Sequence, residues 1–254
     1  MSRILLTNDD GIFAEGIYEI AKLLAKEHEL YVVAPESQRS GASHSITLRK
    51  ELILKEVKLP ELENVHAYSL SGTPADCVRF AIGTLHVQPN LVVSGINLGA
   101  NLGTDVFYSG TLGAATEGAL MGFRSIALSV VSHNARYVKD AARLCMDAVN
   151  FYLENSDCCN LMSVNVPNLP YDEIKGAVIA HLSHREYPSE YVKQPDGSYV
   201  MPPWSLVENN DKKSDESMIV NGYVTYTPVL TQRCESEALD PMRTRLAAWQ
   251  KKGE

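Results

Sequence analysis

The chain has 254 residues, which is enough for one large domain, or for a domain with a substantial appendage. Hydrophobic residues make up 45% of it and charged residues 21%, the proportions of an ordinary soluble globular protein. The formal net charge of −8 argues against a nucleic-acid polymer or an anionic membrane as the main partner, although a bound cation would still allow a small phosphate ester to bind.

Two further features indicate the cellular compartment. No apolar run approaches the roughly 18–20 residues of a membrane span, and the N-terminal stretch MSRILLTNDD is charged too soon for a secretory signal. The five cysteines are odd in number and include no C-x-x-C pair, which is typical of free thiols in a reducing cytosol. We therefore expect a cytoplasmic protein without a membrane partner.

The first half of the chain alternates predicted strands with predicted helices. The short apolar run at 3–7 predicts a buried parallel strand, and apolar residues at helical spacing predict a helix at 15–27. Further strands are expected at 30–35, 51–57 and 66–70. After them, Thr73, Pro74 and Asp76 occupy the N-cap, first and third positions of a capping box, which predicts the start of another helix.

The second half continues the alternation and then changes in character. Strands are expected at 90–95, 125–131, 161–167, 176–182 and 222–229, and helices at 112–122, 137–153 and 239–251. The alternation predicts a single α/β domain over residues 1–254, with a three-layer, Rossmann-like, doubly wound and mostly parallel sheet. At 184–215 a Pro-Asp-Gly turn lies between aromatic stretches, which predicts a projecting β-hairpin arm whose exposed aromatic side chains contact another subunit.

Three polar stretches follow predicted strands at the carboxyl edge of the sheet, where the ligands of open α/β sheets gather. They lie at 9–10, 37–47 and 94–118. One interpretation of Asp9 and Asp10 is a turn that also caps the next helix. It explains one of the two aspartates well and the second poorly. Two carboxylates about 4 Å apart repel by ~1–4 kcal/mol, and either a proton or a divalent cation removes that cost.

Oxygen ligands select a hard cation such as Mg²⁺, Mn²⁺ or Ca²⁺. Ser40 and Asn97 each follow another strand end and supply neutral oxygens. We therefore expect one divalent ion per subunit, held by Asp9, Asp10, Ser40 and Asn97. The catalytic groups are then Asp9, Asp10 and Asn97, and either aspartate can serve as the base.

The glycine-rich stretch contains no Walker pattern, no G-x-G-x-x-G and no G-x-S-x-G elbow. Its tripeptide Ser109-Gly110-Thr111 precedes the helix predicted at 112–122, and a helix N-terminus with free N–H groups binds anions. A flexible loop with an ordinary cap is the alternative. Two neighbours, Phe107 and Tyr108, suit either a stacked base or the core, and core packing is the expectation.

Five stretches together resemble the SurE family, the stationary-phase survival proteins that act as metal-dependent 5′/3′-nucleotidases. They are ILLTNDDGIFAEGI, VVAPESQRSGASHSIT, SGTPADCVRFAI, VSGINLGANLGTDVFYSGTLGAATEGALMG and NGYVTYTPV. They occur in the order of the family and span nearly the whole chain. The resemblance implies a cytoplasmic homodimer or homotetramer in which the arm and the C-terminal segment, 230–254, are exchanged between subunits.

The resemblance also implies roles for individual residues. A divalent metal is bound by Asp9, Asp10, Ser40 and Asn97, and the phosphate by Ser109, Gly110 and Thr111 with Gly41 and Asn101 nearby. The implied reaction is hydrolysis of a nucleoside 5′- or 3′-monophosphate to nucleoside and phosphate by a metal-activated water. Two alternatives stay open: a broad-range phosphatase or exopolyphosphatase, and a nucleotide-binding stress protein without turnover.

Overall fold

The computed structural model describes residues 1–155, 158–185, 190–202, 210–231 and 239–250, with side chains in the last segment described for residues 240–245. Nine strands form one sheet and two more form a small hairpin. The sheet contains β1 (Arg3–Thr7), β2 (Glu29–Pro35), β3 (Leu54–Glu56), β4 (His66–Leu70), β5 (Leu91–Leu98), β6 (Ser125–Val131), β7 (Leu161–Pro167), β8 (Ala177–Ile179) and β11 (Val224–Pro228).

The strand order is β3-β4-β2-β1-β5-β6-β7-β11-β8. Pairing is parallel except between β3 and β4 and between β7 and β11, so the prediction of a mostly parallel α/β sheet is confirmed. Strands β1 and β5 are neighbours at the centre although β5 begins 84 residues after β1 ends, from residue 7 to residue 91. Their carboxyl ends therefore meet at one edge.

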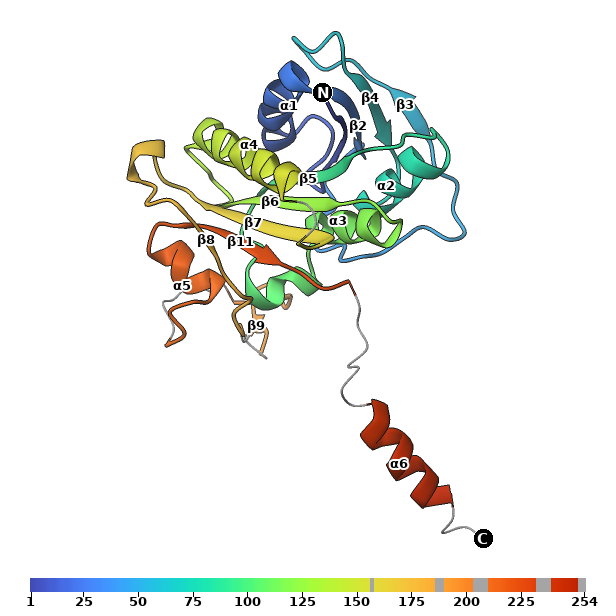
Figure 1. Cartoon of the computed structure of the whole chain (residues 1–254), viewed down its shortest axis with the longest axis vertical. Coiled ribbons are helices and arrows are strands. Elements are labelled where there is room, and N and C mark those ends of the chain that lie inside the picture. Colours follow the sequence, from blue (N-terminus) through green and yellow to red (C-terminus); the bar gives the residue numbers. More distant parts are fainter. Residues whose placement is uncertain (156–157, 186–189, 203–209, 232–238, 251–254) are drawn as a thin grey trace.

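Helices cover both faces of the sheet (Figure 1). The helices and 3₁₀ turns are α1 (Glu15–Glu27), α2 (Pro74–Gly83), η1 (Gly103–Phe107), α3 (Gly110–Leu120), α4 (Val138–Glu154), η2 (Tyr171–Glu173), α5 (Asp215–Val220) and α6 (Leu239–Gln250). One core cluster joins α1 and α4 to alternate side chains of the central strands, such as Leu6 and Val93. A second joins α2 and α3 to the intervening side chains, such as Leu5 and Val92. No helix in these described ranges is long and apolar enough to cross a membrane.

The helix starts show why these segments fold locally. Thr73 accepts a hydrogen bond from the Asp76 N–H, and the Asp76 carboxylate accepts one from the Thr73 N–H, so the predicted capping box is confirmed. Helix α3 begins at Gly110, two residues before the expected start. The Ser109 hydroxyl oxygen accepts a hydrogen bond from the Leu112 N–H at 3.1 Å and sets this boundary.

The segment predicted as an arm, 184–215, contains a short hairpin and ends where helix α5 (Asp215–Val220) begins. Strands β9 (Val192–Lys193) and β10 (Tyr199–Val200) pair in an antiparallel hairpin, with exposed Tyr191 and Tyr199. The hairpin is much shorter than 184–215, and residues 186–189 and 203–209 lie outside the described part. Ser214 caps helix α5, which the sequence did not predict because six residues are too few for an apolar periodicity.

Candidate active site

A tight turn after β1 presents the two adjacent aspartates at the sheet edge. The Asn8 side chain donates to the Gly11 carbonyl at 2.9 Å and accepts from the Gly11 N–H at 3.2 Å. Gly11 adopts φ +105°, a left-handed conformation that glycine accommodates without strain. The turn therefore fixes the backbone of Asp9 and Asp10, and the predicted carboxylate pair lies at the carboxyl end of β1.

Asp9 is the more buried of the two, with 4% of its surface exposed. Its Oδ1 accepts a hydrogen bond from the Thr111 hydroxyl at 2.6 Å. Burial raises the pKa of Asp9 to about 6, and the neighbouring Asp10 charge adds to the rise, while the bond from Thr111 opposes it. A buried carboxylate whose pKa is raised in this way is more typical of a functional site than of a residue that serves folding.

Asp10 connects the other two predicted ligands to this turn. Its Oδ2 accepts from the Leu98 N–H at 3.2 Å, so Asn97, the preceding residue on β5, lies beside it. Gln38 donates to Asp10 Oδ1 at 3.4 Å and to the Ser40 hydroxyl oxygen at 2.9 Å, which brings Ser40 to the same place. Burial raises the pKa of Asp10 as well.

The donor set fits a divalent cation with oxygen ligands. Asn97 uses its amide N–H to bind the Gly99 carbonyl at 2.9 Å, which leaves Oδ1 as an available oxygen. Two carboxylates with raised pKa values and two neutral oxygens match Mg²⁺, Mn²⁺ or Ca²⁺, because a positive charge relieves the crowding of Asp9 and Asp10. Within the described ranges, no group of three or more His, Cys, Asp or Glu residues forms an alternative metal site.

The N-terminus of α3 lies directly on Asp9. A Cβ atom at Gly110 would lie 3.0 Å from Asp9 Oδ2, a tight contact that would require the carboxylate to shift. Ser109, Gly110 and Thr111 form the first turn of this helix, where backbone N–H groups lack helical partners and bind anions. The predicted phosphate loop and the predicted metal ligands are thus adjacent.

The two remaining predicted phosphate contacts, Gly41 and Asn101, differ from each other in their surroundings. Gly41 has φ +70°, and a Cβ atom there would have no atom within 4 Å, so this position is open. Asn101 is 4% exposed, and its side-chain amide donates to the Ser129 hydroxyl oxygen at 2.7 Å. The described contacts of the Asn101 side chain therefore lead to β6 rather than to the 109–111 loop.

The expectation that Phe107 and Tyr108 pack in the core is wrong. Phe107 is 58% exposed and Tyr108 57%. The Ser43 hydroxyl donates to the Phe107 carbonyl at 2.6 Å, and the Ser43 N–H donates to the Tyr108 carbonyl at 3.0 Å. These bonds fix the backbone while the rings remain at the surface.

Comparison with known proteins identifies the family. The family model described as "Survival protein SurE" matches residues 4–189. The chain belongs to the SurE family. The protein named 5′-nucleotidase SurE from Thermosipho africanus is 41% identical over 252 residues, which cover 95% of this chain and 96% of that one. The protein of the same name from Petrotoga mobilis is 39% identical over 250 residues, covering 96% and 98%.

A solved structure of the SurE family has the same fold. The crystal structure of the SurE protein from Aquifex aeolicus aligns with a TM-score of 0.84 at 32% sequence identity, covering 95% of this chain and 98% of that chain. The family expected from the resemblance and the α/β architecture expected from the alternation of strands and helices are therefore confirmed.

Three residues near this SurE-family site were missed by the sequence analysis. Gln38 bridges Asp10 and Ser40, as described above. Asn165 on β7 is 1% exposed; its Oδ1 accepts from the Asn101 N–H at 2.9 Å and its Nδ2 donates to the Asn101 carbonyl at 3.0 Å. Glu117 on α3 binds His44 at 2.7 Å. For the last two, the available signal was a polar residue within an otherwise apolar segment.

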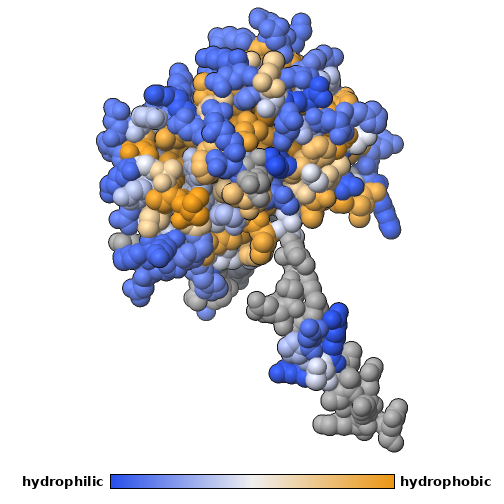
Figure 2. Space-filling view, viewed as in Figure 1, coloured by the Kyte–Doolittle hydropathy of each residue, from blue (hydrophilic) through white to orange (hydrophobic). Residues whose placement is uncertain are grey.

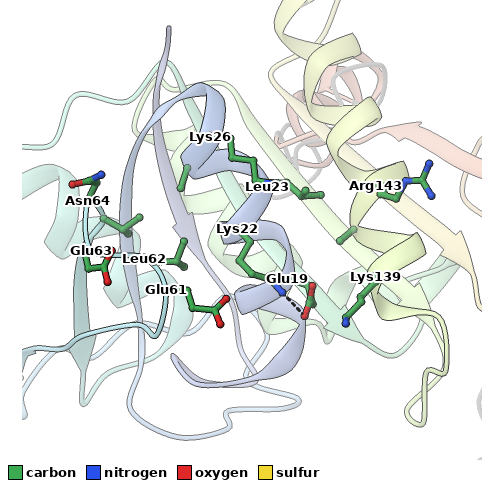
Figure 3. Close-up of a pocket in the computed structure, with 13 residues that line it drawn as sticks. Glu19, Lys22, Leu23, Lys26, Glu61, Leu62, Glu63, Asn64, Lys139 and Arg143 are labelled. Atoms are coloured by element: carbon green, nitrogen blue, oxygen red, sulfur yellow. Dashed lines mark hydrogen bonds and ion pairs between the residues drawn. The ribbon is translucent and has the colours of Figure 1, made fainter.

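A separate cavity of about 510 Å³ lies between α1, α4 and the loop at 61–65 (Figure 3). Charged side chains of both signs line it, among them Lys22, Lys26, Glu61, Glu63, Lys139 and Arg143. None of the predicted site residues lines it. The carboxylate pair and the α3 N-terminus, not this cavity, therefore form the candidate active site.

Proposed function

We propose that this SurE-family protein is a divalent-metal-dependent phosphomonoesterase that hydrolyses nucleoside 5′- and 3′-monophosphates to nucleoside and inorganic phosphate. The names of its relatives from Thermosipho africanus and Petrotoga mobilis support nucleotidase activity. The observation that carries the proposal is the contact between Thr111, at the N-terminus of α3, and the buried Asp9 beside Asp10. In the proposal the first turn of α3 binds the phosphate and the two aspartates bind the cation, so this contact supports a metal ion and a phosphate bound next to each other.

The metal ligands in this proposal are the side chains of Asp9, Asp10, Ser40 and Asn97. A bound Mg²⁺, Mn²⁺ or Ca²⁺ ion would supply the positive charge that polarises a phosphoryl group and lowers the pKa of a water. The chain itself fixes the ligands: Gln38 orients Ser40 toward Asp10, and the bond from Asn97 to Gly99 orients the Asn97 Oδ1.

The phosphate is held by the first turn of α3. The backbone N–H groups of Gly110 and Thr111 and the hydroxyl group of Ser109 stabilise the negative charge on the phosphoryl oxygens, and this charge is greatest in the transition state. A Cβ atom at Gly41 would meet nothing within 4 Å, which leaves room for a substrate at this position, and Asn101 supports the 99–103 loop. Asp9 or Asp10 accepts the proton of the attacking water.

The assembly we propose is a homodimer or homotetramer of the single 1–254 domain, in which the arm and the 230–254 segment cross to another subunit. Helix α6 stands apart from the sheet in Figure 1, and Figure 2 shows its described surface as mainly hydrophilic. A lone helix of 12 residues is marginal in water, so contact with another subunit would stabilise it. Exposed Tyr191 and Tyr199 on the hairpin favour the same interpretation.

Phosphate release from AMP tests the proposed activity. We expect release by the purified protein with Mn²⁺ or Mg²⁺, loss of release in EDTA, and recovery when metal is restored. Asp9→Asn keeps the acceptor for Thr111 but removes one charge, so kcat/KM should fall by about 100-fold or more, the scale of losing one electrostatic stabiliser. Asp172→Asn makes the same substitution at an exposed position; it is the matched control and should retain activity.

A second measurement separates a metal ligand from an unrelated catalytic role. Mn²⁺ should raise the melting temperature of the wild type and of Asp172→Asn, because a ligand that binds the native state stabilises it. The rise should be much smaller in Asp9→Asn. Full activity and a full Mn²⁺-dependent rise in Asp9→Asn would refute the metal role, and release from polyphosphate but not AMP would favour the broad-range alternative.

A further inference from the structure

Two adjacent aromatic side chains lie at the surface directly before the phosphate loop. Phe107 and Tyr108 are 58% and 57% exposed, and Tyr108 immediately precedes Ser109, the N-cap of α3. Single exposed apolar residues are common and need no explanation. Two large neighbouring rings beside an anion-binding turn are a more specific arrangement.

Polar contacts with Asp215 and Arg185 hold the segment that leads to these rings. The Gly103 N–H donates to Asp215 at 2.8 Å, and the Thr104 hydroxyl donates to the Arg185 carbonyl at 2.9 Å. The Arg185 guanidinium, 7% exposed, pairs with Asp105 and lies 3.4 Å from Glu216. These polar contacts hold the first three residues of η1, the turn that ends at Phe107.

The 37–47 loop, which carries the proposed metal ligand Ser40, also holds this segment. Ser43, three residues after Ser40, binds the carbonyls of both aromatic residues at 2.6 and 3.0 Å. A Cβ atom at Gly113 would lie 2.3 Å from the Ser43 carbonyl oxygen, so this part of the 37–47 loop lies directly on α3. The backbone of Phe107 and Tyr108 is therefore held between the 37–47 loop and the start of α3, and a ligand that binds to a preformed surface loses little ordering entropy.

We propose that Phe107 and Tyr108 form the stacking surface for the nucleobase of the substrate. The inference rests on the proposed function, because it takes the phosphate to be bound at 109–111. In a nucleoside monophosphate a single sugar joins the base to the phosphate, so the base must lie close to the phosphate loop. Every base has a π face, so stacking on aromatic rings accepts purines and pyrimidines alike. The surface thus selects nucleotides over other phosphate esters without selecting one base.

The test compares a substrate that has a base with one that lacks it. AMP and ribose 5-phosphate carry the same phosphate and sugar, and only AMP can stack. In the double variant Phe107→Ala/Tyr108→Ala we expect kcat/KM for AMP to fall about 10-fold or more, mainly through KM, as loss of base–aromatic stacking predicts. In the same double variant, kcat/KM for ribose 5-phosphate should stay within about 2-fold of the wild-type value.

Matched variants control for packing. Leu120→Ala removes a side chain that is also 57% exposed, at the opposite end of α3, and should leave both substrates unaffected. The swap Phe107→Tyr/Tyr108→Phe keeps both rings and should retain AMP selectivity. If the alanine variants fail to fold, Phe107→Leu/Tyr108→Leu replaces the rings with apolar side chains that cannot stack.

Direct binding makes the result independent of turnover. Calorimetric affinity for AMP and for ribose 5-phosphate, measured with Mn²⁺ present, should show the same selective loss in the double variant. An equal loss for both ligands, or no loss for AMP, would overturn the inference. A change in oligomeric state with AMP affinity unchanged would assign the rings to contact between copies instead. If the wild type binds AMP selectively but releases no phosphate, the proposed reaction fails while the stacking surface stands.

Discussion

Asp76 shows how one buried carboxylate serves two distant segments. Beyond its part in the capping box of α2, its Oδ1 accepts from the Thr47 N–H at 2.9 Å and its Oδ2 from the Thr47 hydroxyl at 2.6 Å. Burial favours the neutral form, but the hydrogen bonds from Thr47 and Thr73 outweigh it and lower the pKa of Asp76. The ionised Asp76 thereby fastens the end of the 37–47 loop, which carries Ser40, to α2.

Asp76→Asn should destabilise the protein in a pH-dependent way. At pH 7 we expect the free energy of unfolding to fall by about 1–3 kcal/mol, because an amide NH₂ group would face backbone and hydroxyl donors. The lowered folded pKa means that the wild type has this stabilisation above the unfolded value of 3.8 and loses it as the pH falls through the lower folded value. The gap between the two proteins should thus be constant from pH 5 to 7 and shrink below about pH 4.

Urea denaturation between pH 3 and 7 measures this gap. Asp172→Asn is the control, since Asp172 is exposed on η2. A gap that stays the same down to pH 3 would mean that Asp76 acts by shape alone. The sequence predicted the capping box from four adjacent residues, but the bonds to Thr47 join positions 29 residues apart and depend on the folded path of the loop.

At the scale of elements, α1 and β5 approach so closely that the helix requires glycine at their contact. A Cβ atom at Gly16 would lie 2.0 Å from the Ile96 carbonyl oxygen. Ile96 precedes Asn97, the proposed metal ligand on β5. The packing of one helix against the sheet is therefore linked directly to the position of a side chain in the site.

Gly16→Ala should push α1 away from β5. We expect a loss of about 1–3 kcal/mol in the free energy of unfolding, the usual cost of overpacking, and weaker Mn²⁺ binding because Asn97 moves with Ile96. Gly83→Ala is the matched control: Gly83 ends α2, and a Cβ atom there would meet nothing within 4 Å. Thermal unfolding and Mn²⁺ titration of both variants check this, and equal behaviour of the two would contradict it.

The predicted elements agree best with the structure where their pattern is local. The strands at 66–70, 125–131 and 161–167 match β4, β6 and β7 at both ends. The strands predicted at 51–57 and 176–182 are only three residues long, as β3 and β8. Both lie at the two edges of the sheet, where a single neighbouring strand determines how much of an extended segment is paired.

At the scale of the molecule, the site joins four segments that the sheet topology brings together. The turn at 8–11, the loop at 37–47, the end of β5 and the start of α3 meet through contacts of Asp9 and Asp10. That these segments follow strands on one edge was predictable from the alternation of strands and helices. Strand order was not predictable, and the bridge made by Gln38 and the clamp between Asn165 and Asn101 depend on it.

The C-terminal segment lies outside the part of the chain that forms the sheet and the candidate site. All nine strands of the sheet and the four contacting segments lie within residues 1–231, whereas α6 lies apart from them (Figure 1). The described side chains of α6, from residue 240 to residue 245, are exposed. Such a helix adds little to the stability of its own domain and is suited to contact another subunit.

Removing residues 232–254 should therefore dissociate the protein without unfolding it. We expect light scattering after gel filtration to give a larger mass for the full chain than for the truncated one, beyond the difference in chain length. The melting temperature of the full chain should rise with protein concentration, as mass action requires for an oligomer, and that of the truncated chain should rise less. Met242→Ala, which changes one exposed side chain of α6, tests whether the helix surface itself makes the contact. An unchanged assembly after truncation would place the subunit contact on the body of the domain or on the hairpin, and the C-terminal segment would then have no part in it.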